Sequence, residues 1–463
     1  MAVVVISLTL VSGRSSEDPR TPEGLPGLTP PFLGVAVVGS GGKTAAVDAY
    51  GNVVDLRAPG PAGEPLVAVS SDRQAAGTVP PDGGIVARAQ LGGGETAPLW
   101  EANSVEQRYL PGTNVLWTVA RFDGRRVVVT RGLGLRAVRA DRRWIARVLP
   151  LGPGAPGWAR RLYERSLLVL RALTDRHTGA GAAGARDSWA YVWPRDAGAV
   201  ALAFAAAGYR AEARRVVRFL RSLDLEAAAR FHGDGTPVEG RAAQGDAAGW
   251  LVAAERATGL AGGQASGPGA IERSRRAEPS GPWRGRADYQ EGEAGDYAAN
   301  AIASGVRNAS LRGYFEHRKE LVRVAGDPAS GVDSAVAWAI RPFPRPALFP
   351  LVRRSLRHLL AERRTRFGIV PSESWHGGED PWTAPTAWTA WAFATLTRHG
   401  KRSALAMRDR RTALGLMADL RRAATPLGLL PERVDIHTGL PTSTTPLAWS
   451  HAFAILALRE LWP

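Results

Sequence analysis

Two glutamates in turn-rich stretches of the chain have the chemistry for acid–base catalysis: Glu291 in "DYQE" and Glu432 in "LLPERVDIHTG". Hydrolysis of a glycosidic bond needs one carboxylic acid that protonates the leaving oxygen. It also needs a second carboxylate that activates water or attacks the sugar. The two residues are far apart in the sequence, so they can cooperate only if the fold brings them together. Each could instead be a surface charge or a favourable charge at a helix N-terminus.

Carboxylates and tryptophans gather in the same predicted loops. Asp196 and Asp288 precede apolar stretches, where an aspartate can also serve simply as a helix N-cap. A flat aromatic face beside carboxylates suits a sugar, which has apolar C–H faces and a polar rim. Sugar contacts are therefore expected of the loop tryptophans Trp189, Trp193, Trp283, Trp375 and Trp382. Core packing is expected of the tryptophans inside apolar helices, Trp250, Trp338, Trp388, Trp391 and Trp449.

Composition excludes several other chemistries. The chain has 463 residues and no cysteine, so disulfides, thiolate metal sites and cysteine nucleophiles are excluded. No phosphate-binding loop, dinucleotide fingerprint or metal-spaced histidine cluster occurs, and we expect no cofactor and no metal. His437 and His451, near Glu432, are expected to support neighbouring site residues or to pack, rather than to bind a metal.

The charge and the N-terminus bear on partners and location. The formal net charge is +16, but the arginines are scattered through helical stretches and no nucleic-acid-binding motif is present. We therefore expect no nucleic-acid partner, although a polyanion-binding protein stays an alternative. The apolar start "MAVVVISLTLVSG" is shorter than the roughly 20 residues of a membrane span. A cytoplasmic protein without a membrane partner is expected. A signal peptide is not excluded, and the oligomeric state is left open.

Two regions of the chain differ in residue pattern, and the boundary between them lies near the Gly/Pro-rich segment 152–157. Residues 1–29 are expected to be poorly ordered or to form a short strand. Residues 30–150 hold short β-branched runs such as "GVAVVGSGG", "NVLWTVARF" and "RRVVVTRG", which predict antiparallel strands in a trimmed β-sandwich-like domain. Residues 151–463 show helical periodicity. The predicted helices lie near 157–174, 196–208, 210–223, 243–259, 295–309, 311–325, 331–340, 347–362, 383–398, 403–423 and 446–461.

The helices alternate in character. Stretches such as "DAGAVALAFAAAG" and "APTAWTAWAFATL" are almost uncharged, whereas their partners, such as "AEARRVVRFLRSLD", carry an arginine-rich face. Alternating buried and half-exposed helices predict two concentric rings, an (α/α)6 toroid. The loops that lead into the inner helices then share one end of the barrel. Function is expected there, because these loops carry the carboxylates and the loop tryptophans.

Four short motifs along the chain support the prediction of a helical toroid with its function at one end. The chain resembles glycoside hydrolase family 15, the glucoamylase family, in "YVWPRDA" (191–197), "DYQE" (288–291), "GGEDPWTAPTAW" (377–388) and "LPERVDIHTGLPTSTTPLAWSHA" (430–452). The segments "KTAAVDAYGNVVDL" and "RYLPGTNVL" resemble the β-sandwich domain of that family. The resemblance implies an inverting, exo-acting α-glucoside hydrolase with an oligo- or polysaccharide substrate. A trehalase of the same family and a non-catalytic carbohydrate-binding relative are the alternatives.

The resemblance also implies residue roles. It gives Glu432 the role of the base that activates water and Glu291 the role of the general acid. The implied sugar-binding residues are Trp193, Arg195, Asp196, Gln244, Asp246, Asp288, Tyr289 and Trp382. The chain departs from the family pattern at Gln290, where the family has a tryptophan beside the acid, and this puts the substrate in question. Glu293 lies two residues beyond Glu291 and could compete for its role.

Overall fold

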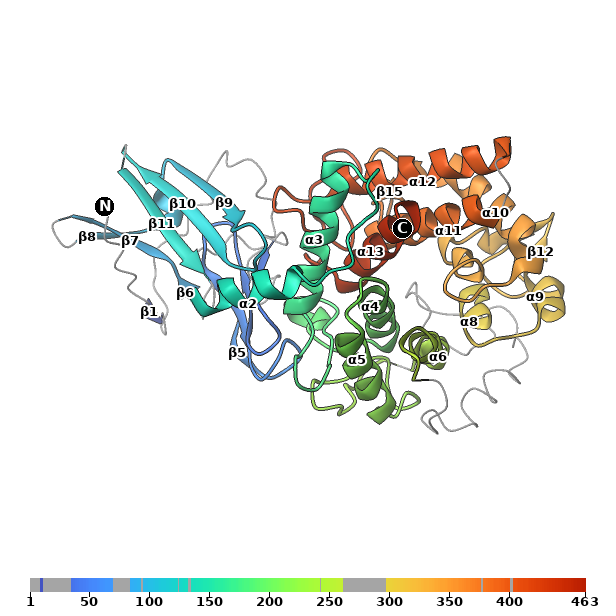
Figure 1. The fold of residues 1–463 in the computed structure, drawn as a ribbon, viewed down its shortest axis with the longest axis horizontal. Helices are drawn as coiled ribbons and strands as arrows, with labels where there is room; N and C mark the ends of the chain where they lie inside the picture. The colour runs from blue at the N-terminus through green and yellow to red at the C-terminus, as the bar shows by residue number, and fades with distance from the viewer. Residues whose placement is uncertain are drawn as a thin grey trace.

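The computed structural model describes residues 9–10, 35–69, 84–92, 95–123, 125–131, 135–241, 243–260, 297–375, 378–399 and 403–463. Figure 1 shows mainly strands in the first part of the chain and mainly helices in the remainder. The predicted fold class, a mainly helical domain preceded by an antiparallel β region, is confirmed. Helix α2 (Leu135–Ile145) already lies before residue 151, and the division of the chain into domains at that point stays a prediction.

Among the described residues, the β region contains two antiparallel sheets and a hairpin. The first sheet has the order β1-β6-β4-β3-β2, with β5 also paired to β4, and the second has the order β11-β10-β9. Strands β7 and β8 form the hairpin. The strands are β1 (Thr9–Leu10), β2 (Ala36–Gly39), β3 (Thr44–Val47), β4 (Val53–Arg57), β5 (Pro65–Ala68), β6 (Ile85–Val86), β7 (Arg88–Gly92), β8 (Glu95–Pro98), β9 (Ser104–Tyr109), β10 (Leu116–Phe122) and β11 (Arg125–Arg131). The three β-branched runs correspond to β2, β10 and β11.

Strands β2, β3 and β4 of the first sheet are buried on both faces, because they pack against both the second sheet and the helices. Side chains alternate along a strand with a period of two. Accordingly, Val37 and Ala46 pack into the core of the helical region, whereas Val38 and Ala45 pack in a cluster with Leu116 of the second sheet. Small apolar residues therefore fill β2 and β3 in place of an alternation of apolar and polar residues.

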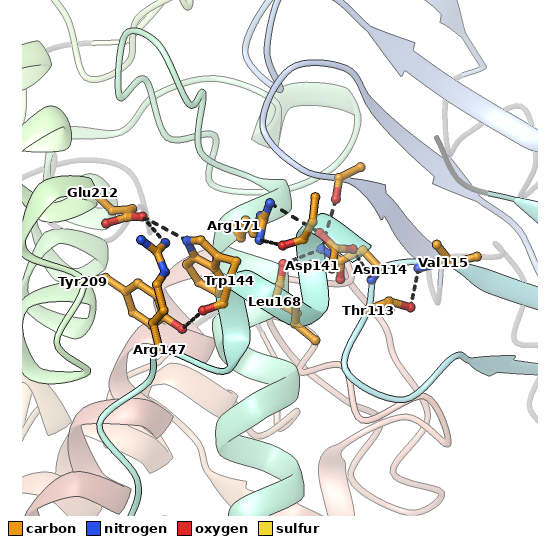
Figure 2. A network of polar contacts seen from close by, with 12 residues as sticks. Thr113, Asn114, Val115, Asp141, Trp144, Arg147, Leu168, Arg171, Tyr209 and Glu212 are labelled. Atoms are coloured by element: carbon orange, nitrogen blue, oxygen red, sulfur yellow. Dashed lines mark hydrogen bonds and ion pairs between the residues drawn. The ribbon is translucent and has the colours of Figure 1, made fainter. Parts of the chain in front are cut away.

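Polar contacts join the β region to the helices (Figure 2). Asn114, just before β10, is buried, and its Nδ2 donates to the carbonyl of Gly39 at 3.0 Å and to the carbonyl of Leu168 at 2.7 Å. Its Oδ1 accepts from Arg165 at 3.0 Å, and its backbone N–H donates to Asp141 of α2 at 2.9 Å. The side chain of Asn114 thus connects β2 with α3 (Gly157–Ala172), and the backbone N–H of the same residue binds α2.

We expect Asn114→Ala to lower the free energy of unfolding by about 2–4 kcal/mol, because it leaves buried polar groups without their partner. Urea denaturation followed by circular dichroism measures the change. Thr130→Ala, on the exposed side of β11, is the control and should stay within about 0.5 kcal/mol of the wild type. Equal stability of the two variants would contradict the role given to Asn114.

The helices after α3 alternate between an inner and an outer position. They are α4 (Pro194–Ala206), α5 (Arg210–Ser222), α6 (Ala247–Thr258), α8 (Ala298–Ala303), α9 (Asn308–Phe315), α10 (Phe349–Arg363), α11 (Thr383–His399), α12 (Ala404–Ala423) and α13 (Ala448–Leu461). The 3-10 helices are η1 (Leu99–Glu101), η2 (Asp187–Trp189), η3 (Pro328–Ser330), η4 (Ser334–Ala339) and η5 (Pro346–Leu348). Short hairpins are formed by β12 (Glu316–His317) with β13 (Glu320–Leu321) and by β14 (Arg364–Thr365) with β15 (Gly368–Ile369).

The inner segments form a closed ring. In cyclic order α4, α6, α8, η4, α11 and α13 each contact the next, and α13 contacts α4 again. Outside them α5 packs on α4 and α6, α9 on α8, α10 on η4, α12 on α11 and α3 on α13. The Gly/Ser-rich segment 260–282, expected to replace or distort an outer helix, lies outside the described residues from 261 onward. The predicted toroid is therefore confirmed by the contacts of the described residues.

Glycines and aromatic rings allow this close packing. A Cβ on Gly249 would lie 2.3 Å from the carbonyl oxygen of Ala303, so α6 and α8 can approach only with a glycine here. The centre of the ring is filled by Trp250, Trp338 and Trp388, whose rings meet edge to face with centroids 5.0 and 5.5 Å apart. The core role predicted for the helical tryptophans is confirmed.

Three predicted helices are wrong in part. In the described part of the range 295–309, α8 ends at Ala303 and α9 begins only at Asn308. The range 311–325 contains only the end of α9, because Arg318 and Lys319 adopt positive φ angles of 49° and 64°. Two consecutive residues of this kind form a tight hairpin turn, and the β12–β13 hairpin replaces the rest of the helix. The range 331–340 forms the 3-10 helix η4, with Asp333 as its N-cap.

Candidate active site

The segments that precede the inner helices meet at one end of the ring. The segment before α4 bridges the N-cap residue of α13 through Gly184 and Leu447. Trp382, just before α11, pairs with Ile369 and with Arg433. Because helix N-termini carry partial positive charge, this end of the ring favours anionic groups.

Glu432 is fixed by its backbone at this end. Its N–H donates to the carbonyl of Thr444 at 2.9 Å, and its carbonyl accepts from the N–H of Thr383 at 3.0 Å. The hydroxyl of Thr383 donates to the neighbouring Pro431 carbonyl and contacts Ser450 of α13 at 2.7 Å. The residue is therefore held between the N-terminus of α11 and the segment that leads into α13.

Both carboxylate oxygens of Glu432 accept hydrogen bonds. Trp189 Nε1 donates to Oε1 at 3.3 Å, and the hydroxyl of Ser443 donates to Oε2. Burial raises the pKa of Glu432, while these two donors and the charges of Arg433 and Arg241 act in the opposite direction. The donors orient the carboxylate and favour its ionised form, which is the form that a general base needs.

We expect Ser443→Ala to raise the pKa of Glu432, because the variant loses a hydrogen bond that stabilises the carboxylate. A base with a raised pKa is protonated at higher pH, so the acidic limb of the kcat/KM profile should move to higher pH. Below the pH optimum, kcat/KM of the variant should be lower than that of the wild type by on the order of tenfold, the usual effect of one hydrogen bond to a charged group. Ser222→Ala on the outer helix α5 is the control. An unchanged acidic limb in Ser443→Ala would contradict the predicted role of Glu432 as the base.

A second polar cluster contains Arg195, Gln244 and Asp246. Arg195 Nη1 donates to Asp246 Oδ2 at 3.2 Å. With its amide oxygen turned toward the guanidinium, Gln244 accepts from Arg195 at 3.2 and 2.6 Å. Trp250 Nε1 also donates to Asp246 at 3.1 Å, and the Arg195 guanidinium lies 5.0 Å from the centre of the Trp449 ring. The structure thus brings together three predicted sugar-binding residues and fixes the guanidinium.

Asp196 lies in the first turn of α4 and is buried. Burial raises its pKa to about 7. Arg195 opposes this shift, and the charges of Glu432 and Asp246 add to it. The charge of Glu432 thus contributes to the raised pKa of the Asp196 carboxyl. The N-cap position of α4 belongs to Trp193, so the interpretation of Asp196 as an N-cap is not supported.

The predicted tryptophan walls lie at the same end of the ring. Trp193 is half-buried, with the guanidinium carbons of Arg230 and Arg241 5.9 and 5.4 Å from the centre of its ring. Trp382 is half-buried and meets Trp375 edge to face at 5.2 Å. Its strand-like pairing with Arg433 places it beside Glu432.

The remaining predicted site residues lie outside the described residues. These are Asp288, Tyr289 and Glu291, together with Gln290, Glu293 and Trp283. Their roles stay predictions.

Sequence reasoning did not assign three residues around Glu432. Trp189 had a signal, since it is one of the loop tryptophans, but its contact with Glu432 could not be predicted from its position. Ser443 lies within the quoted motif 430–452 but was given no role there, and Arg241, whose charge acts on Glu432, had no signal in the sequence.

His437 is exposed and is not a packing residue, whereas His451 is buried and serves packing, as expected. Its Nε2 accepts from the N–H of Leu430 at 2.9 Å, and its Nδ1 meets the hydroxyl of Ser166 at 2.9 Å. Burial lowers its pKa to about 3, so the ring is neutral and steadies the segment before Glu432. The residues that the structure describes contain no group of three or more side chains able to hold a metal ion. Within the same residues no helix has the length and apolar character of a membrane span.

Comparison with known proteins agrees with the predicted resemblance. The family model described as glycosyl hydrolases family 15 matches residues 157–247, which include α3, α4 and the Arg195–Gln244–Asp246 cluster. No curated protein matches the sequence significantly. The predicted resemblance to this family is confirmed over the matched residues, and it indicates a glycoside hydrolase.

Solved structures share the fold at low sequence identity. A bacterial glucoamylase complexed with acarbose has a TM-score of 0.62 and 12% identity, covering 99% of this chain and 97% of that one. A wild-type glycosidase has a TM-score of 0.53 and 19% identity, over 67% of this chain and 100% of the other. A glucoamylase from Saccharomycopsis fibuligera has a TM-score of 0.52 and 13% identity, over 65% and 94%. The architecture is thus that of glucoamylases.

Proposed function

We propose that the protein is an inverting, exo-acting α-glucoside hydrolase that releases glucose from the non-reducing ends of α-glucans or oligosaccharides. The observation that carries the proposal is the Glu432 carboxylate, which Trp189 and Ser443 orient at the end of the ring that holds the Arg195–Gln244–Asp246 cluster. The family match over 157–247 and the glucoamylase-like fold support it.

In this proposal Glu432 acts as the general base. The ionised carboxylate takes a proton from a water molecule while the water oxygen attacks the anomeric carbon of the terminal glucose. Glu291 donates its proton to the glycosidic oxygen, so that the leaving sugar departs as an alcohol. Attack from the opposite face inverts the configuration and gives β-glucose. Such a mechanism needs the two carboxyl groups roughly 6.5–9.5 Å apart, so that water fits between them.

The polar cluster has the role of holding the terminal sugar. Asp246 and Gln244 hold the Arg195 guanidinium in one orientation, so in this proposal it meets sugar hydroxyls at little cost in side-chain entropy. Asp196 accepts hydroxyl hydrogen bonds beside the base. Trp193 and Trp382 cover the apolar faces of the sugar, and Asp288 and Tyr289 complete the subsite in this proposal.

A panel of maltose, isomaltose, panose, dextran and trehalose tests the proposal. Glucose release from maltose, panose or dextran supports the glucoamylase-like activity, whereas hydrolysis of trehalose alone favours a trehalase. Gln290, in place of an aromatic residue beside the proposed acid, is the observation that favours a non-catalytic relative. Calorimetric binding of maltose or panose without turnover of any substrate would select that alternative.

A further inference from the structure

A groove separate from Glu432 lies where the β region meets the helical ring. Strand β9, helix α3 and the segment after α12 form its walls, and its volume is about 560 Å³. That size lies within the range of pockets that bind small molecules. None of its lining residues belongs to the site described above.

The groove is strongly basic. Arg108, Arg161, Arg165 and Arg421 line it, with Glu164 as the one acidic lining residue among those described. Within the described part of the chain, none of the four arginines forms an ion pair with a carboxylate. Four guanidinium groups and the single carboxylate of Glu164 give the described lining residues an excess of positive charge. Charge complementarity therefore favours an anionic occupant.

Arg165 gives the groove a preorganised floor. Its guanidinium lies 3.7 Å from the centre of the Tyr109 ring, and its Nη1 and Nη2 donate to Asn114 Oδ1 at 3.0 Å and to the Thr113 carbonyl at 2.9 Å. Burial lowers the pKa of Arg165, because the charged guanidinium loses favourable contact with water. A bound anion would offset that loss.

Trp158 gives the groove an aromatic wall. The residue is half-buried, its ring meets Trp462 edge to face at 6.0 Å, and the Arg421 guanidinium lies 5.9 Å from the ring centre. An indole ring next to guanidinium groups suits a ligand with an apolar face and a phosphate group. Arginine is also the side chain best matched to phosphate, because its planar fork donates two parallel hydrogen bonds.

We propose that this groove binds a phosphorylated sugar, with the phosphate on Arg161 and Arg421 and the sugar ring against Trp158. The occupant would touch both the β region, through Arg108, and the ring, through α3. Because such a ligand binds the assembled protein and not the unfolded chain, its binding raises the melting temperature.

Titration calorimetry on the full chain with glucose 6-phosphate and with inorganic phosphate tests the proposal. We expect both to bind, glucose 6-phosphate more tightly, with affinities that fall as sodium chloride is raised. The double variant Arg161→Gln/Arg421→Gln should weaken both by at least about tenfold, the effect of roughly 1.4 kcal/mol. Trp158→Ala should remove the preference for the sugar phosphate.

The control is Arg218→Gln/Arg411→Gln, which removes two exposed arginines elsewhere and changes the net charge equally. It should leave binding unchanged. Melting curves without ligand check that each variant is folded. The proposal is overturned if neither phosphate compound binds, or if the control pair weakens binding as much as the groove pair. Equal affinities for the two compounds would reject the sugar part of the proposal.

Discussion

Glu432→Gln is expected to lower kcat on maltose by roughly 10³–10⁴-fold while leaving the fold intact, because the amide cannot take a proton from water. The amide oxygen can still accept a hydrogen bond from Trp189 or Ser443, so the side chain keeps a similar position. KM should change much less than kcat, since the sugar-binding cluster around Arg195 is untouched. Steady-state kinetics on the purified variant measures both parameters.

The control is Glu379→Gln, which removes an exposed carboxylate whose partner is Arg363. This variant should retain activity close to that of the wild type. Near-wild-type turnover in Glu432→Gln would remove this residue from the role of base.

Glu291→Gln is expected to lower kcat/KM on maltose by roughly 10²–10⁴-fold, because the leaving sugar then departs without a proton. Glu293→Gln is the matched variant, since Glu293 lies two residues further along the chain and is the alternative candidate for the same role. We expect Glu293→Gln to retain most of the activity.

A substrate whose leaving group needs little protonation distinguishes the role of the acid from the role of the base. Fluoride needs little protonation to leave, so Glu291→Gln should hydrolyse α-glucosyl fluoride far better than maltose relative to the wild type. Glu432→Gln should lose activity on both substrates, because water still has to be activated. If Glu293→Gln shows the fluoride rescue and Glu291→Gln does not, the acid is Glu293.

The ring could be predicted because burial leaves a clear pattern in the sequence. Inner helices such as α4 and α11 have neighbours on nearly every side, so they carry almost no charge, whereas outer helices such as α5 keep an arginine-rich face. The β12–β13 hairpin could not be predicted in the same way. Its turn depends on positive φ angles at Arg318 and Lys319, two residue types that normally favour a helix.

The site was predictable in its residue types but not in its contacts. The motif around Arg195 and Asp196 marks a polar N-terminus on an apolar helix, and that is visible in the sequence. The hydrogen bonds of Glu432 to Trp189 and Ser443 depend on the approach of separate loops, which no local pattern encodes. The groove at Arg165 likewise depends on the packing of the β region against α3.

The configuration of the first-formed product tests the central claim, that Glu432 activates water for direct attack opposite the leaving group. Proton NMR of a fresh digest of maltose distinguishes the two anomers of glucose before they equilibrate. The proposed mechanism predicts β-glucose at early times, followed by slow conversion toward the equilibrium mixture. Initial release of α-glucose would contradict the account, because it requires a covalent intermediate and a different role for Glu432.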